Sequence, residues 1–382
     1  MTAITIDSIR LHQAALPLVE PLQTSFGREA MHPALLVEIR SGDRVGWGEC
    51  TAGIAPGYSY ETIGTAYHVI TRFLAPALLG QTVHSVAEAR QLMAGVRGHP
   101  LAKASLEGAV WDLLAQARQM SLADLLWEVY PLDRARRHQV TVGVSIGIQP
   151  TIDDTLAIIE KRLREGYRRI KLKIKPGWDV ELAAAVRKTY PDIMLMLDAN
   201  SAYTLDDADH LAKLDRFDLL MLEQPLAHHD IYEHSQLQPR LDTPICLDES
   251  ILCANDVRLA LEIGACRIIN LKPPRVGGLH EACAIHKLCY DEGVPLWIGG
   301  MLETGIGRAQ NVAVASLPGV TLPSDLSATN RYYDPDIAGP PFVLNDDSTL
   351  DVPNQVGTGV TIDPVAFEEA VARWSRAFPD WW

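Results

Sequence analysis

Four apolar runs in the middle of the chain decide the fold: RRIKLKIK (168–175), MLMLDAN (194–200), LLMLEQP (219–225) and ICLDES (245–250). Each run is short and ends on charged residues, and Asp198, Glu223 and Asp248 follow one another at intervals of 25 residues. A period of this length accommodates one strand, one helix and two loops. Nearly continuous apolar runs are typical of strands in a parallel sheet buried on both faces. Charge at the carboxyl-terminal tips of such strands indicates the active-site face of a parallel α/β barrel.

The second half of the chain continues this alternation of strand and helix. A further run, CRIINLKP (266–273), ends on Lys272, 24 residues after Asp248, and helical patterns such as 280–293 separate the runs. Alternation of this kind predicts a TIM-type barrel of the α/β class rather than an open sheet. No GxGxxG motif follows the first strand, which argues against a dinucleotide-binding fold. The eight predicted strands are 140–148, 168–175, 194–200, 219–225, 245–250, 266–273, 294–301 and 319–326.

The N-terminal part has a different pattern and predicts a separate α+β domain. Alternating stretches at 4–16 and 34–50 predict strands, and residues 61–130 have helical periodicity. Polar loops at 21–33 and 51–62 are either plain connections or lids over a site. The predicted organisation is an α+β domain at 1–135, the barrel at 136–340, and a C-terminal segment at 341–382 that packs back on the first domain.

Composition and charge argue against several classes of protein. The 382 residues carry a net charge of −14, which disfavours a nucleic-acid-binding surface. No stretch approaches about 18 uninterrupted apolar residues and the N-terminus lacks a signal-peptide pattern, so neither a membrane span nor secretion is expected. The six cysteines show no CxxC pair and no zinc spacing, and we expect them to be reduced and mostly buried. We therefore expect a cytoplasmic homo-oligomer that acts on a small molecule.

Asp198, Glu223 and Asp248 are candidate metal ligands. Three carboxylates at neighbouring strand tips repel one another, and a divalent cation removes that cost. Oxygen ligands favour a hard ion, Mg²⁺ or Mn²⁺, over zinc. The alternative is that the three acids are separate salt-bridge partners. Asn200 and Glu249 are either supporting groups that hold a ligand or a lysine in place, or simple turn and cap residues.

Lys173 and Lys272 are candidate acid/base residues. Strands two and six of an eight-stranded barrel lie opposite each other, so these lysines are expected to face each other across the mouth. Lys171 shares the face of Lys173, because strand side chains alternate. A cation and a second lysine lower the pKa of an amine, and Lys173 is the better candidate for a neutral base. Arg275 has the same effect on Lys272, or only holds a loop. A lone strand-end lysine, by contrast, is usually a solvated surface residue.

This arrangement predicts chemistry at the α-carbon of a carboxylate substrate. A carboxylate bound to the cation has an acidified α-proton, and the ion stabilises the enediolate that forms when the proton leaves. Bases on both faces of that carbon permit removal of the proton from one face and its return on the other, which is racemisation. A leaving group on the β-carbon turns the same intermediate into an elimination.

Several motifs resemble the enolase superfamily, and more closely its muconate-lactonising subgroup, whose two bases are lysines on the second and sixth strands. These motifs are KLK (171–173), DAN (198–200), EQP (223–225), DES (248–250) and NLKPPRVGG (270–278). The stretches GVSIGIQ (143–149) and WIGGMLETGIGRAQNVAVASLPGVTLPSD (297–325) are similar to o-succinylbenzoate synthases that also act as N-succinyl- or N-acylamino acid racemases. The likeness covers nearly the whole chain and implies a modified (β/α)₇β barrel with an N-terminal α+β capping domain.

The resemblance also implies roles for individual residues. Lys173 and Lys272 correspond to the acid/base pair, and Asp198, Glu223 and Asp248 to the Mg²⁺ ligands. The chain departs from the family pattern at Pro274, where glycine is common. Proline removes an amide donor, which puts the placement of Arg275 in doubt. The residues implied to contact or support the substrate are Ser145, Lys171, Asn200, Arg275, Gly300, Met301 and Glu303, and those expected to set specificity from the loops are Thr24, Ser25, Arg28 and Tyr58.

Three related activities and one unrelated role compete for this chain. The first activity is a Mg²⁺-dependent o-succinylbenzoate synthase, which dehydrates a cyclohexadiene carboxylate in menaquinone biosynthesis. The second is an N-succinylamino acid racemase on the same scaffold. A dipeptide epimerase or a cycloisomerase is the third. A metal-dependent binding protein is the non-enzymatic alternative, and it requires the strand-end lysines to be incidental. A panel of substrates separates the three activities.

Overall fold

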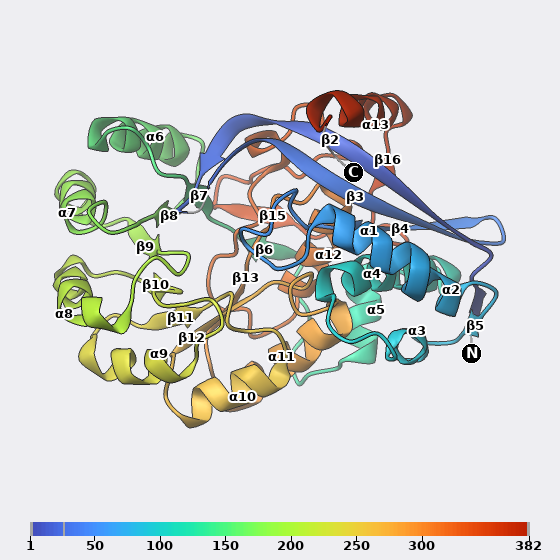
Figure 1. Ribbon diagram of the computed structural model, residues 1–382, viewed down its shortest axis with the longest axis horizontal. Helices are drawn as coiled ribbons and strands as arrows, with labels where there is room; N and C mark the ends of the chain where they lie inside the picture. Colours follow the sequence, from blue (N-terminus) through green and yellow to red (C-terminus); the bar gives the residue numbers. More distant parts are fainter. Residues whose placement is uncertain (1–2, 26, 380–382) are drawn as a thin grey trace.

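A parallel barrel sheet forms the centre of the protein. The computed structural model describes residues 3–25 and 27–379, so the ends of the proposed first and third segments lie outside the described residues. Seven parallel strands follow one another in chain order around the sheet, and helices cover its outer side (Figure 1). The strands are β7 (Val144–Ile146), β8 (Arg169–Lys173), β9 (Met194–Asp198), β10 (Leu222–Glu223), β11 (Ile245–Leu247), β12 (Ile268–Leu271) and β13 (Leu296–Ile298).

The register of this sheet brings the charged strand tips side by side. Lys173 on β8 is the cross-strand partner of Asp198 on β9, and Asp198 is in turn the partner of Glu223 on β10. Because parallel strands point the same way, their carboxyl ends meet at one edge. The apolar residues between the tips are buried, as expected for a sheet covered on both faces.

The eighth predicted strand, 319–326, is not a regular strand, and that prediction was wrong. The segment makes only two isolated parallel bridges, Val320 to Leu296 and Ser324 to Val142. Pro323 lacks a backbone N–H, so an uninterrupted ladder is impossible there. The N–H groups of Ser324 and Asp325 still donate to carbonyl oxygens of the strands on either side, Thr141 and Ile298, each at 2.9 Å. This irregular segment therefore closes the barrel between β13 and β7.

The barrel helices begin and end at residues that suit helix termini. In α6 (Ile152–Arg164) the hydroxyl of Thr151 accepts the N–H of Asp154 at 3.1 Å, and basic residues fill the last turn, where they complement the helix dipole. The other helices are α7 (Val180–Thr189), α8 (Ala208–Leu211), α9 (Tyr232–Leu237), α10 (Ala254–Glu262), α11 (Leu279–Glu292) and α12 (Gly305–Ala315), with short 3₁₀ turns η2 (Leu205–Asp207), η3 (Ala212–Phe217), η4 (Gln238–Arg240) and η5 (Thr329–Arg331).

The N-terminal capping domain is an antiparallel sheet packed against helices, and it lies over one side of the barrel mouth (Figure 1). The expected polar loop at 21–33 is much shorter in the structure, because Gln23 pairs with Arg28 and the hairpin continues to that point. The elements are β1 (Ile4–Thr5), β2 (Ser8–Gln23), β3 (Arg28–Ser41), β4 (Arg44–Cys50), α1 (Ile63–Val69), the π-helical turn η1 (Ile70–Leu74), α2 (Ala75–Leu78), β5 (Thr82–Val83), α3 (Val86–Met93), α4 (Pro100–Ala117) and α5 (Leu122–Val129).

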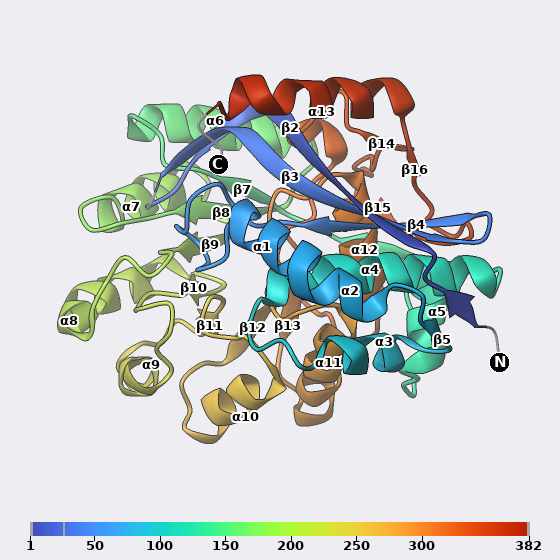
Figure 2. The same cartoon turned by 45° about the vertical axis from the view of Figure 1, so that its right-hand side comes forward.

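The C-terminal segment returns across the N-terminal sheet. Helix α13 (Pro364–Ala377) lies along β2 and β3 (Figure 2), and the guanidinium of Arg373 donates to the carbonyl oxygen of Ala15 at 2.9 Å. Its side chains Ala370 and Trp374 are buried. Short strand pairs tie the preceding stretch down: β15 (Thr349–Asp351) pairs with β6 (Gln139–Thr141), and β14 (Ala338–Gly339) pairs with β16 (Thr361–Ile362).

Two further observations concern the membrane span and the cysteines considered in the sequence analysis. None of the helices in the described ranges is both long enough and apolar enough to cross a membrane. All six cysteines are free, and every one except the partly exposed Cys253 is buried. Burial raises the pKa of the Cys50 thiol, so it is held as an apolar core group rather than as a reactive thiolate.

We predict that Gly48→Ala strongly destabilises the protein. A Cβ at Gly48 would lie 1.8 Å from the carbonyl oxygen of Ser105, so helix α4 would have to move away from β4. Overpacking of this kind costs about 1–3 kcal/mol or more in the free energy of unfolding, measured by urea denaturation. Gly95→Ala is the matched control, because a Cβ there meets nothing within 4 Å. Equal stability of the two variants would contradict the close packing.

Candidate active site

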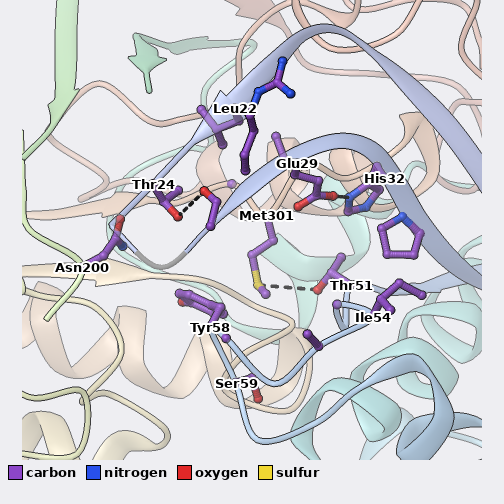
Figure 3. Close-up of a pocket in the computed structure, with 18 of the residues that line it drawn as sticks. Leu22, Thr24, Glu29, His32, Thr51, Ile54, Tyr58, Ser59, Asn200 and Met301 are labelled. Atoms are coloured by element: carbon purple, nitrogen blue, oxygen red, sulfur yellow. Dashed lines mark hydrogen bonds and ion pairs between the residues drawn. The ribbon is translucent and has the colours of Figure 1, made fainter. Parts of the chain in front are cut away.

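A cavity of about 590 Å³ opens where the carboxyl ends of the barrel strands meet the capping domain. Figure 3 shows its walls, with Glu29 beside His32 on one side and Thr51 next to Met301 on another. Among the residues predicted from the sequence, those that line the cavity are Thr24, Arg28, Tyr58, Ser145, Lys171, Lys173, Asn200, Lys272, Gly300 and Met301. The others, Ser25, Asp198, Glu223, Asp248, Arg275 and Glu303, lie behind this lining or beside it.

The three predicted ligands are buried, and each is paired with a lysine. Asp198, Glu223 and Asp248 are no more than 1 % exposed. A Lys173 Nζ–Asp198 Oδ2 contact of 2.6 Å, a Lys171 Nζ–Glu223 Oε2 contact of 3.0 Å and a Lys272 Nζ–Asp248 Oδ2 contact of 2.9 Å join the two sets of charges. Buried charges require such pairing, because an isolated ion in the protein interior carries a large desolvation penalty.

The carboxylates nevertheless repel one another. Burial, followed by repulsion from Asp198, raises the pKa of Glu223 and also that of Glu249. Burial acts in the same direction on Asp198, but attraction to Lys173 and Lys171 outweighs it and lowers the pKa of that carboxyl. In addition, Oε2 of Glu249 is buried and has no hydrogen-bond partner among residues 3–25 and 27–379. The site therefore has one buried carboxylate oxygen that is free to accept.

This donor set fits a hard divalent cation by its chemistry. All the candidate ligands are carboxylate oxygens, which Mg²⁺ and Mn²⁺ prefer, and Oε2 of Glu249 is a buried acceptor with no partner among the described residues. Within residues 3–25 and 27–379, however, no three Asp, Glu, His or Cys side chains converge as a ready-made metal cage. To hold such an ion, Asp198, Glu223 and Asp248 would have to exchange contacts with lysine for contacts with the ion.

The pKa of Lys272 is raised, so of the two alternatives for Arg275 the lowering of this pKa does not apply. Its Nζ lies 3.0 Å from the hydroxyl of Tyr58 and 2.9 Å from Asp248, and 4.5 Å from the centre of the Tyr58 ring. Burial lowers the pKa of the amine, but attraction to Tyr58, Glu223 and Glu249 outweighs it, so the pKa is raised. In this arrangement Lys272 is an ammonium held among anions.

Lys171 is an interior charge rather than a second base beside Lys173. Its Nζ contacts Asp325 at 2.5 Å and lies 4.9 Å from the centre of the Trp297 ring. Burial lowers its pKa, but attraction to Asp325, Glu223 and Asp198 raises it overall. Both lysines line the cavity, but the side chain of Lys173 is more accessible, at 10 % exposed against 4 % for Lys171, and it donates to Oδ1 of Asn200 at 2.8 Å. Of these two lysines, Lys173 is placed to meet a substrate.

Asn200 contacts the predicted ligand Asp198 and Lys173 directly, and Glu249 contacts Asn200. The backbone N–H of Asn200 donates to Asp198 at 3.0 Å, and its side-chain NH₂ donates to Oε1 of Glu249 at 3.0 Å. Since the amide oxygen of Asn200 also accepts from Lys173, hydrogen bonds connect the side chains of Lys173, Asn200 and Glu249. Asn200 adopts φ +43°, a left-handed turn conformation that asparagine tolerates. The sequence left open whether Asn200 is a supporting group or a turn residue, and in the structure it is both.

Tyr58 lies closer to Asp248 and Lys272 than its position in a loop suggested. Its hydroxyl is 3.2 Å from Oδ1 of Asp248 and accepts from Lys272 and from Nη1 of Arg275, the latter at 3.3 Å. The capping domain therefore contributes a group to the centre of the site. The other loop residues lie further out: Ser25 donates to the carbonyl oxygen of Asn200 at 3.3 Å, and Arg28 is exposed at the cavity wall.

Pro274 does not displace Arg275. The guanidinium is buried, donates to Asp248, and also reaches the carbonyl oxygens of Ile251 at 2.8 Å and Asn270 at 2.6 Å. The turn needs no amide donor at Pro274, whose carbonyl oxygen accepts from Gly277 at 3.2 Å. The missing N–H of proline is therefore harmless at this position.

Asp325 is a site residue that the sequence reasoning missed. It accepts from Lys171, pairs with Arg169 at 2.6 Å, and accepts the hydroxyl of Ser145 at 3.2 Å. Attraction to these cations outweighs burial and holds the pKa of Asp325 well below its usual range. The signal was available, because Asp325 ends the eighth predicted strand, and the strand-tip rule that selected the other acids selects it too.

Comparison with known proteins places the chain in a family. Residues 154–366 match the description Enolase C-terminal domain-like, and residues 6–127 match the N-terminal domain of mandelate racemase / muconate lactonizing enzyme. The chain belongs to the enolase superfamily. This confirms the resemblance seen in its motifs and the capped TIM-type barrel expected from it.

Several enolase-superfamily relatives match this chain over nearly its whole length. An o-succinylbenzoate synthase from Geobacillus kaustophilus is 48 % identical, with 94 % of each chain covered. An N-succinylamino acid racemase from Amycolatopsis is 46 % identical, covering 95 % of this chain and 97 % of the relative. A crystal structure of an enolase-superfamily member from Listeria innocua superposes with a TM-score of 0.90 at 39 % identity, covering 96 % of this chain and 97 % of that one.

We predict that Asp325→Asn lowers the free energy of unfolding by about 3 kcal/mol, because it leaves Lys171 and Arg169 buried without a counter-charge. Urea denaturation measures this change. Asp209→Asn, which removes an exposed ion pair with Arg240, is the control and is expected to stay within about 0.5 kcal/mol of the wild type. A loss no larger than in the control would show that Asp325 does not neutralise the two cations.

Proposed function

We propose that this enzyme abstracts the α-proton of a small carboxylate substrate with the help of Mg²⁺, as an o-succinylbenzoate synthase, an N-succinylamino acid racemase, or both. One observation carries the proposal: Lys173 and Lys272, from opposite strands, line one cavity with buried carboxylates between them. Relatives bearing each of the two names match the chain at similar identity, 48 % and 46 %, which supports both activities.

Asp198, Glu223 and Asp248 are the residues proposed to hold the ion. A divalent cation bound there supplies the positive charge that stabilises a developing enediolate. Asn200 and Glu249 restrain Asp198 and Lys173 from behind. The carboxylates that raise the pKa of Lys272 include Glu223, a proposed ligand, so Lys272 would lose part of that stabilisation if Glu223 turned to an ion.

Lys173 and Lys272 move the protons in this proposal. For racemisation, the Nζ of one lysine takes the α-proton and the Nζ of the other delivers a proton to the opposite face of the same carbon. For dehydration, one lysine suffices, because it takes the α-proton and then protonates the departing hydroxyl when both lie on one face. We assign that role to Lys173, with Lys272 serving as a nearby positive charge. General acid/base catalysis of this kind contributes about 10²–10⁴ in rate.

The remaining alternatives have less support. A hydrophobic dipeptide epimerase from Enterococcus faecalis is only 28 % identical to this chain. A 2-chloromuconate cycloisomerase from Rhodococcus opacus shares the fold at 23 % sequence identity. A metal-dependent binding protein would tolerate the loss of Lys173 without any change in turnover. The cytoplasmic location and homo-oligomeric state expected from the sequence stay predictions, and sedimentation velocity tests the second.

We predict that activity requires a hard divalent ion. Excess chelator should abolish turnover, and Mg²⁺ or Mn²⁺ should restore it, since only oxygen ligands are available. Asp248→Asn should weaken Mg²⁺ binding in calorimetric titration, because it removes one of three ligand charges. Asp346→Asn, an exposed carboxylate, is the control. Full turnover in excess chelator would rule out the metal assignment.

We predict that the two lysines act on opposite faces of the α-carbon. Lys272→Ala should abolish racemisation but allow deuterium exchange from D₂O at the α-carbon of one enantiomer, through Lys173. Lys173→Ala should abolish both the exchange of that enantiomer and dehydration. Proton NMR of each enantiomer in D₂O measures these outcomes, with the exposed Lys213→Ala as control.

One outcome would contradict the assignment of one lysine to each face. Each lysine variant, still folded and still binding Mg²⁺, would lose exchange of both enantiomers to the same extent. A single shared base or a coupled pair would then describe the site better.

A further inference from the structure

The loop between β13 and α12, residues 299–304, forms one wall of the active-site cavity. Gly300, Met301 and Leu302 line the cavity from this loop. Leu302 adopts φ +61°, a left-handed conformation that costs free energy for a residue with a side chain. A loop in such a conformation persists only where the surrounding structure holds it.

Glu49 of the capping domain holds the end of this loop. Its carboxylate accepts the N–H of Thr304 at 3.0 Å, the hydroxyl of Thr304 at 2.7 Å and the N–H of Gly307 at 3.0 Å. Glu49 is buried and forms no ion pair with any residue in the part of the chain that the structure describes. The positive end of helix α12 and these donors take the place of a counter-charge.

The contact goes beyond ordinary capping of a helix. The hydroxyl of Thr304 already serves α12 as its own cap by accepting the N–H of Ile306 at 3.3 Å. Glu49 is therefore an additional acceptor that comes from another domain. Close approach depends on glycine at Gly307, because a Cβ there would lie 2.9 Å from Oε2 of Glu49.

A second residue of the same segment reaches the middle of the loop. The hydroxyl of Thr51 lies 3.5 Å from the sulfur of Met301, and Figure 3 shows the two side chains facing each other in the cavity wall. Tyr333 donates its hydroxyl to the carbonyl oxygen of Leu302 at 2.5 Å, and Glu303 accepts the N–H of Met301 at 2.9 Å. The contacts of Glu49 and Thr51 link the loop to the capping domain, and Leu302 also packs against the apolar cluster that includes Leu16 and Leu36.

We propose that Glu49 is a positioning residue through which the capping domain sets the shape of the 299–304 wall and so controls substrate binding. The effect of Glu49 on substrate binding rests on the proposed function, because it is measured through the KM of that activity. Glu49 does not contact the lysines or the proposed ligands, so its loss acts on how the substrate is held rather than on proton transfer. The contact itself exists whether or not the enzyme has either proposed activity.

The test uses Glu49→Gln together with a matched pair of variants at Thr304. Glutamine replaces one carboxylate oxygen by an NH₂ group, which cannot accept the backbone N–H groups that face it. Thr304→Val removes the hydroxyl with little change in shape, and Thr304→Ser restores it. Ser85→Ala is the control, because it removes the cap of α3, a helix of the capping domain that does not line the cavity.

Hydrogen exchange and steady-state kinetics give two independent readouts. In Glu49→Gln and Thr304→Val the amides of 301–307 should lose protection, and KM should rise about tenfold, the effect of losing one hydrogen bond to a charged group, while kcat stays within about twofold. Thr304→Ser should behave like the wild type. The double variant Glu49→Gln/Thr304→Val should lose less than the sum of the two single variants, because both variants break the contact between Glu49 and Thr304.

Each other result overturns the proposal. Protection lost without any rise in KM would show that the loop does not bind substrate. A fall in kcat alone, matching that of Ser85→Ala, would show a general loss of stability. If Glu49→Gln does not fold, Thr304→Val and Thr304→Ser still decide the question. Since hydrogen exchange needs no substrate, failure of both proposed activities would leave the test of the contact intact.

Discussion

Compensation of buried charge at the tips of the barrel strands is the constraint on which the rest of the structure depends. Asp198, Glu223, Asp248 and Asp325 are buried there, and without partners each would carry a large desolvation penalty. Lysines from the second and sixth strands and two arginines, Arg169 and Arg275, supply the counter-charge. A site built of paired charges keeps its side chains in place and holds acidic and basic groups within reach of one cavity.

The pairing also explains how one scaffold can serve more than one reaction. The acids and lysines stand on rigid strands, while the residues that meet the rest of a substrate come from loops of both domains. Tyr58 from the capping domain reaches the same carboxylate as Lys272 and Arg275. Glu49 and Thr51, also from that domain, hold the barrel loop that forms another wall. In the proposed function, proton transfer and substrate selection thus fall to different elements that share contacts.

Much of the fold was predictable, because the relevant signals are local. The seven strands were recognised from short apolar runs, and the tips of those strands identified the acids and lysines. Two details of the fold were not predictable. Pro323 interrupts the eighth strand without preventing closure, and the hairpin of β2 and β3 extends through a polar stretch that looked like a loop. In both places long-range backbone pairing overrides local preference.

The sequence by itself determined the barrel class and all the strand-tip residues discussed above except Asp325, because periodicity and side-chain chemistry are properties of neighbouring residues, and its motifs indicated the family by resemblance. Only the tertiary structure decided how the charges are shared. It made Lys171 an interior partner of Asp325, raised the pKa of Lys272, and brought Tyr58 and Glu49 to the barrel from a distant part of the chain. A pKa and a contact between domains depend on distances between residues far apart in the chain, and spacing along the chain does not encode those distances.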